Sequence, residues 1–258
     1  MPSPRFFCAA STGAQPPQAL DIITRRITLS EPLKMTPIKP IFGAFAPGAD
    51  LRGCTPSLSR VFLLSPANTS AIRGQLLLNG NSDFELAQRL RREGAPLGEI
   101  FSFISSLYFR GKLAYAGAFS QSSTGFPAMF VMTSSRGLLL PTTLITLDDL
   151  REMSAVPIDP SNARYRGPLC RDGRELARGL PPGSEIVLLG SIASGKYIDP
   201  LLEIFGANLL FPQSFVGRGD MSRGGLMLRS VETGIELDYV PVVSAVRRGS
   251  RPPKLEPR

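Results

Sequence analysis

The chain has 258 residues, of which 43% are hydrophobic, and it carries a formal net charge of +8 at neutral pH. This length and apolar content suffice for one α/β domain with extensions. There is no histidine, which excludes Ser-His-Asp, Cys-His and histidine–metal chemistry, so any catalysis must use other side chains or groups of a ligand.

The three cysteines, Cys8, Cys54 and Cys170, are odd in number and widely spaced. This pattern argues against a disulfide framework and against a thiolate metal site. No apolar run approaches the roughly 18 residues of a membrane span, and the first residues lack the apolar core of a signal peptide. We therefore expect a cytoplasmic protein with no membrane contact, no metal and no cofactor, in an oligomeric state that the sequence leaves open.

The positive charge is unevenly spread along the chain. Residues 241–258 contain five basic residues and one acidic residue, whereas residues 51–240 contain 19 basic and 17 acidic ones. We expect a basic disordered tail over 245–258, which either holds RNA, DNA or anionic lipid or simply aids solubility. Frequent prolines predict a partly disordered extension over 1–58, leaving a single α/β domain over 59–244.

The first half of that domain begins with an apolar run at 60–65 that predicts a strand, followed by a polar loop over 66–73. A helix is expected over 82–92, with Ser82 as its N-cap and Glu85 as the partner in a capping box.

Further elements alternate in the same way as far as residue 243. A long amphipathic stretch over 97–119 predicts a helix broken near Gly111, and Thr146 precedes the short helix expected at 148–153. The remaining expected elements are strands at 128–133, 185–189, 208–211 and 236–243, the last of them at an edge, helices at 162–180 and 198–205, a glycine-arginine loop over 215–225, and a helix or strand at 226–231. Strands separated by helices indicate a three-layer α/β/α sandwich with a mostly parallel central sheet.

The strand at 185–189 leads into Gly190-Ser-Ile-Ala-Ser-Gly-Lys196, which has the G-x-x-x-x-G-K spacing of a phosphate-binding loop. The next residue is Tyr197, where a serine or threonine would hold magnesium, and no acidic metal-holding strand follows. We therefore expect a loop that accepts a phosphate or carboxylate, against the alternative of a tight turn with a surface lysine. The candidate ligands here are Gly190, Ser191, Ser194, Gly195 and Lys196.

A second candidate is the loop that contains Arg218, Asp220, Ser222 and Arg223. Its glycines permit close backbone approach, and its two arginines are suited to an oxyanion. In a catalytic reading Asp220, or else Asp159, is the base; in the alternative reading Asp220 pairs with one of the arginines.

Polar residues also follow the other predicted parallel strands. Asn68 and Arg73 follow the first strand, and Ser134 and Arg136 follow the second. The carboxyl ends of parallel strands meet at one edge of a sheet, so these groups are expected to converge there. Tyr108 completes the set as a residue beside the same pocket.

Three segments carry a family resemblance: Leu-Leu-Ser-Pro-Ala-Asn at 63–68, Leu-Tyr-Phe-Arg-Gly-Lys-Leu-Ala-Tyr at 107–115, and Met-Thr-Ser-Ser-Arg-Gly-Leu-Leu-Leu-Pro at 132–141. Over roughly residues 60–160 the chain resembles the YaaA-type peroxide-stress proteins and the uracil-DNA-glycosylase-like domain of archaeosine synthases. The resemblance implies a glycosylase-like α/β fold and a link to nucleic acid or nucleobases.

Three functions remain open from the sequence. The first is a nucleic-acid- or nucleotide-associated protein that binds a phosphate or related anion at the carboxyl edge of the sheet and acts on a nucleobase if it is catalytic. The second is a transferase or hydrolase for a nucleoside or sugar phosphate, with Tyr108, Ser134 and Asp220 around the pocket. The third is a scaffold without catalysis.

Overall fold

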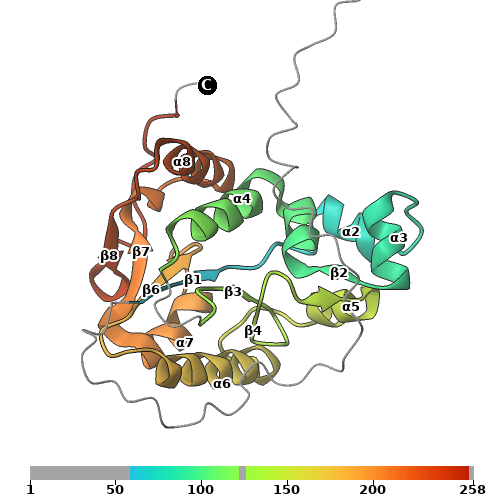
Figure 1. Cartoon of the computed structure of the whole chain (residues 1–258), viewed down its shortest axis with the longest axis horizontal. Coiled ribbons are helices and arrows are strands. Elements are labelled where there is room, and N and C mark those ends of the chain that lie inside the picture. The colour runs from blue at the N-terminus through green and yellow to red at the C-terminus, as the bar shows by residue number, and fades with distance from the viewer. Residues whose placement is uncertain (1–58, 122–125, 256–258) are drawn as a thin grey trace, which may run out of the picture. The chain divides into compact units, whose positions relative to one another are not determined.

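The computed structural model describes residues 59–121 and 126–255, which belong to one compact unit, Gly53–Arg258. The predicted extension over 1–58, with Cys8 and Cys54, lies outside the described residues. A six-stranded mixed sheet has the order β4-β3-β1-β6-β7-β8 (Figure 1). Its strands are β1 (Arg60–Leu64), β3 (Met129–Met132), β4 (Leu138–Leu139), β6 (Glu185–Leu189), β7 (Leu209–Pro212) and β8 (Tyr239–Pro241).

The four inner strands, β3, β1, β6 and β7, are parallel, and the two edge strands, β4 and β8, pair antiparallel. In β1 and β6 the last four residues are buried on both faces, which explains why these strands read as continuous apolar runs. The α/β class and the mostly parallel sheet predicted from the sequence are confirmed, as is the edge position of the last strand.

Helices flank the sheet on both faces (Figure 1). Helix α4 (Leu97–Phe119) and helix α8 (Asp220–Thr233) pack together on one face, and α6 (Ala163–Gly179) and α7 (Gly195–Phe205) pack together on the other. The smaller elements are α2 (Ile72–Leu78), α3 (Glu85–Arg92), α5 (Leu147–Ala155) and the two-stranded pair β2 (Ala95–Pro96) and β5 (Leu144–Ile145), with short 3₁₀ turns at Gly206–Asn208, Gln213–Phe215 and Val242–Ser244.

The chain leaves the neighbouring strands β1 and β6 toward opposite faces of the sheet. After β1 it runs through α4 to β3, whereas after β6 it runs through α7 to β7, on the other side of β1 in the strand order. Two diverging connections open a crevice at the carboxyl ends of the strands, where ligands bind in open α/β sheets. The topology therefore places the crevice between the loops that begin at Ser65 and Gly190.

The expected break in α4 lies at Ser106 rather than near Gly111. Ser106 has φ 46° and ψ −120°, a conformation that a non-glycine residue rarely adopts. Gly111 instead lets two helices approach, because a Cβ there would come within 2.9 Å of the Gly224 carbonyl oxygen of α8. The prediction was wrong because it took the glycine for a helix breaker when its role is in packing.

The helix ends show which local signals are reliable. Thr146 caps α5 in a reciprocal capping box with Asp149, as its position before that helix favours. Ser82 does not cap α3, which begins at Glu85; its hydroxyl donates to the carbonyl of Leu76 instead. That capping prediction was wrong because a tertiary acceptor took the hydroxyl.

The C-terminal part differs from expectation at one boundary. Helix α8 begins at Asp220, so it includes the second half of the predicted glycine-arginine loop and settles 226–231 as helix. Of the predicted basic tail, residues 245–255 are described, and there Pro253 accepts a hydrogen bond from Arg218. In the ranges that the structure describes, none of the helices combines the length and apolar character needed to cross a bilayer.

Candidate functional site

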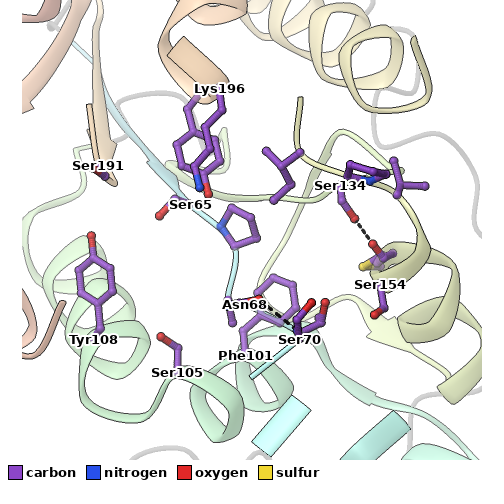
Figure 2. A pocket seen from close by; sticks show the side chains of 18 of the residues that line it. Ser65, Asn68, Ser70, Phe101, Ser105, Tyr108, Ser134, Ser154, Ser191 and Lys196 are labelled. Carbon is purple, nitrogen blue, oxygen red and sulfur yellow. Dashed lines mark hydrogen bonds between the residues drawn. The ribbon is translucent and has the colours of Figure 1, made fainter. Parts of the chain in front are cut away.

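A cavity of about 520 Å³ lies at the crevice between β1 and β6 (Figure 2). This volume is within the range of small-molecule and cofactor sites. Its walls come from the loop after β1, the first half of α4, the start of the loop after β3, the end of α5 with the residues that follow it, the loop after β6, and the first residues of α7 and α8. Hydroxyl groups dominate the polar part of the wall: Ser65, Thr69, Ser70, Ser105, Ser134, Ser154 and Ser191.

Six of the residues expected at the site line this cavity. They are Asn68, Tyr108, Ser134, Ser191, Lys196 and Asp220. They come from five separate segments of the chain, and only the fold brings them together. Ser105 joins them directly before the strained residue Ser106 in α4.

Two of the expected arginines lie elsewhere and have other partners. Arg136 forms ion pairs with Asp149 at 2.6 Å and Glu152 at 2.7 Å, both on α5. Arg73 lies in α2 and donates a long hydrogen bond, 3.4 Å, to the carbonyl of Phe103. Neither side chain lines the cavity.

The residues of the second loop are likewise engaged in local contacts. Arg218 donates to the carbonyls of Ser214 and Pro253 and to the hydroxyl of Ser222. Arg223 is buried, donates to the Phe215 carbonyl and lies 3.7 Å from the carboxylate of Asp220. Of this loop, only Asp220 lines the cavity.

The loop after β6 approaches the β1 loop very closely. A Cβ on Gly190 would lie 3.0 Å from the Cβ of Ser65, and the Ser65 N–H donates to the Leu189 carbonyl. Gly190 therefore makes room for Ser65 at the base of the cavity.

The far end of this loop forms the first turn of α7. Gly195 is the first helical residue, and a Cβ there would lie 2.0 Å from a carboxylate oxygen of Asp199. The Tyr165 hydroxyl donates to the Lys196 carbonyl and thereby anchors this turn to α6. Gly190, Ser194 and Gly195 do not themselves line the cavity.

Lys196 is the only basic residue that lines the cavity among the residues that the structure describes. Its ammonium lies 4.8 Å from the centre of the Tyr197 ring, and it forms no ion pair within the described ranges. Together with Asp220, it gives the wall one cation and one anion, so the cavity can bind a small polar ligand with few charges.

Sequence reasoning missed the most unusual pair of groups at this site, Ser65 and Lys112. The Lys112 ammonium nitrogen lies 2.7 Å from the Ser65 hydroxyl and 2.9 Å from the Ser65 carbonyl oxygen. The lysine is 1% exposed, and it packs 3.9 Å from the centre of the Tyr108 ring. Burial lowers the pKa of Lys112 to about 7, although the charge of Asp220 raises it and that of Arg223 lowers it further.

The helical spacing of the sequence does indicate that Lys112 is buried. Lys112 follows Tyr108 by four positions and precedes Ala116 by four, and both are buried. Residues four apart share one face of a helix, so a lysine at this position must lie on the buried face. The spacing therefore predicts a buried lysine, but no local pattern identifies its partner Ser65, which is 47 positions away.

The buried hydroxyl of Tyr108 forms no hydrogen bond of normal geometry within the described residues, although Arg223 and Ser65 lie close enough to oppose the rise of its pKa. The residue is 5% exposed and lines the cavity, and burial raises the pKa of its phenol to about 12. The phenol therefore stays protonated at neutral pH and can donate a hydrogen bond. Figure 2 shows its hydroxyl and the Ser65 side chain directed toward the same part of the cavity.

An unpartnered buried donor is costly, by about 1 to 3 kcal/mol. Such a group in a cavity wall is available to donate a hydrogen bond to a molecule bound there. Comparison with models of known protein families, with curated proteins and with solved structures returns no match, so the likeness of residues 60–160 to the YaaA-type and glycosylase-like proteins stays a prediction.

Proposed function

We propose that the cavity between β1 and β6 binds a small molecule of the nucleotide class through a single phosphate or carboxylate group. The observation that carries this proposal is the position of Lys196 on the first turn of α7, where its ammonium faces a cavity of about 520 Å³ and pairs with no carboxylate of residues 59–121 or 126–255. A helix N-terminus and a lysine together favour an anion.

The charged groups of the cavity wall limit the charge of the ligand. The arginines that could neutralise a polyphosphate, namely Arg136, Arg218 and Arg223, are engaged by carboxylates, carbonyls and hydroxyls of the protein, and none of the three lines the cavity. One cation facing the ligand suits one anionic group. A nucleoside monophosphate or a sugar phosphate therefore fits this wall better than a triphosphate.

The remainder of the ligand would meet both polar and apolar groups. Apolar contact surface is offered by Pro66, Phe101 and Ile158, and hydrogen bonds are offered by Asn68, Tyr108 and Ser191. This combination suits a base or sugar with several polar atoms on a flat ring.

The glycosylase-like variant of the fold and the cytoplasmic location stay parts of this proposal. The parallel arrangement of β3, β1, β6 and β7 supports the first. The second is supported by Cys170, which is a free, buried thiol. Neither is needed for the binding experiment below.

Binding is tested by titrating the full-length protein at low salt with nucleoside monophosphates, ribose 5-phosphate and a short single-stranded oligonucleotide, using calorimetry. We expect at least one monophosphate to bind. Lys196→Ala should weaken that binding by about 10-fold or more, because a hydrogen bond to a charged group contributes about 1.5 to 3 kcal/mol.

The matched control is Lys254→Ala, which removes an exposed lysine from the C-terminal segment, outside the cavity. It should bind as the unaltered protein does. Absence of binding across the panel, or equal affinity of Lys196→Ala, contradicts the proposal, and a preference for the oligonucleotide would favour a nucleic-acid ligand instead.

A further inference from the structure

We infer that Ser65 and Lys112 form a nucleophile–base pair, and that this protein catalyses acyl transfer from an ester or amide through an acyl-serine intermediate. This inference goes beyond ligand binding and does not depend on the anionic group at Lys196. It rests on three observations: a serine in the cavity wall, a buried lysine that is hydrogen-bonded to this serine, and the buried Tyr108 hydroxyl beside them.

The first observation is the placement of Ser65. It follows the last residue of β1, at the topological switch point, and it lines the cavity although it is only 5% exposed. Its backbone is held by two contacts, an N–H bond to Leu189 and a carbonyl bond from Lys112. A nucleophile that is fixed in this way is oriented before the substrate arrives.

The second observation is the environment of Lys112. Its nitrogen reaches the Ser65 hydroxyl at 2.7 Å, within the distance required of a general base. No carboxylate within the described ranges forms an ion pair with it. Two charged groups of α8 influence the pKa of Lys112: Asp220 raises it and Arg223 lowers it.

A neutral amine satisfies this site completely. The Lys112 ammonium donates to both Ser65 oxygens and lies 3.9 Å from the centre of the Tyr108 ring; after it loses one proton, its lone pair can accept the proton of the Ser65 hydroxyl. With a pKa of about 7, a substantial fraction of the lysine is neutral at physiological pH. Burial that lowers the pKa of a lysine is one route by which proteins activate a neighbouring serine.

The third observation is the Tyr108 hydroxyl. It is buried and protonated, it forms no hydrogen bond of normal geometry within the described ranges, and it is directed into the cavity near Ser65 (Figure 2). A donor of this kind stabilises the negative oxygen that develops when a nucleophile adds to a carbonyl.

The reaction proceeds in two balanced halves. The Ser65 oxygen attacks the carbonyl carbon while its proton passes to Lys112, and the carbonyl electron pair moves to the oxygen, which accepts the Tyr108 hydrogen bond. Collapse expels an alcohol or amine, which takes the proton from the Lys112 ammonium and leaves Ser65 acylated. Water then attacks the ester, gives a proton to Lys112, and releases the carboxylic acid as Ser65 recovers its proton.

The test uses a fluorophosphonate, which transfers its phosphonyl group to activated serines with loss of fluoride. The full-length protein is incubated with the probe and analysed by intact-mass and peptide mass spectrometry. We expect one adduct per chain, on Ser65, and none in Ser65→Ala. Ser244→Ala, which removes an exposed serine that does not line the cavity, should label at the rate of the unaltered protein.

The role of the lysine is tested with two variants. Lys112→Met removes the base, and Lys112→Arg keeps a charge that cannot be released. Both should slow labelling by roughly 100-fold or more, the size of a general-base contribution. Circular dichroism and urea unfolding establish that each variant is folded.

The pH profile gives a readout that needs no variant. Because attack requires neutral Lys112, the labelling rate of the unaltered protein should rise as pH increases through about 7 and then level off. Absence of an adduct, an adduct that persists in Ser65→Ala, or a folded Lys112→Met that labels at the normal rate would overturn the inference. So would a rate that does not change near pH 7.

Discussion

Lys112 is the residue on which the account of the site depends most. A lysine inside the apolar face of a helix loses its hydration, and its charged form is then disfavoured relative to the neutral amine. Within the described part of the chain, its hydrogen bonds go to the carbonyl and hydroxyl oxygens of Ser65. The same contacts that make Lys112 a suitable base also link protein stability to pH.

This linkage predicts how Lys112→Met changes the free energy of unfolding. The pKa of Lys112 is about 7 in the folded state against 10.5 for an unperturbed lysine. Between these values the unfolded chain binds more protons than the folded one, so stability rises with pH. A single group contributes about 1.4 kcal/mol per pH unit over that interval.

We therefore expect the unaltered protein to gain stability relative to Lys112→Met as pH increases from about 7 toward 10. Urea unfolding of both proteins at several pH values measures this difference, in which the titration of all other groups cancels. Parallel stability curves would show that the pKa of Lys112 is not lowered by folding.

At the scale of elements, the packing of α4 against α8 brings Asp220 and Arg223 close to Tyr108 and Lys112. The two helices approach through glycines: a Cβ on Gly111 would lie 2.9 Å from the Gly224 carbonyl oxygen, and one on Gly224 would lie 2.8 Å from the Leu107 carbonyl oxygen. Backbone atoms cannot yield as flexible side chains do. The glycines are therefore needed for this distance between the helices.

Gly111→Ala should consequently destabilise the protein by about 1 to 3 kcal/mol, the usual cost of overpacking. The matched control is Gly117→Ala in the same helix, where a Cβ would meet nothing within 4 Å. That substitution should be neutral or stabilise the protein by up to about 1 kcal/mol, because alanine favours helix more than glycine does. Urea unfolding of the two variants decides this, and equal effects would contradict the proposed contact.

The same elements show what the sequence could and could not predict. The strands β1 and β6 and the capped helices α5 and α6 carry local signals, namely apolar runs and N-cap residues such as Thr146 and Asn162. The kink at Ser106 carries none, because neither glycine nor proline marks it. The role of Gly111 depends on α8, more than 100 residues away, and so could not be read from its own neighbourhood.

The candidate site has the same division between local and tertiary information. The carboxyl-end rule predicted that loops after successive strands would meet, and Asn68, Ser134 and Ser191 do line one cavity. The partners of Arg136, Arg218 and Arg223 are tertiary or backbone groups that no local pattern reveals. Ser65 and Lys112 come together because the chain crosses from β1 to α4, and no local pattern predicts that contact.

At the scale of the whole molecule, the sheet topology explains why the polar groups gather at one place. The chain leaves β1 and β6 in opposite directions. The resulting crevice provides the space for a ligand, and Ser65 lies in its wall. The net charge of +8 has little part in this, because the cavity wall holds one cation and one anion within the described ranges. The function proposed for this protein therefore belongs to the crevice and not to its overall charge.

Protection of Ser65 by a bound ligand tests whether one cavity holds both the ligand and the nucleophile. The full-length protein is labelled with the fluorophosphonate in the absence and presence of the nucleoside monophosphate that binds best, and the adduct on Ser65 is quantified by mass spectrometry. We predict that the saturating ligand slows labelling of Ser65 in the unaltered protein and protects less in Lys196→Ala at the same concentration. Labelling of Ser65 at an unchanged rate with the ligand bound would contradict the claim that one cavity holds both the ligand and the nucleophile.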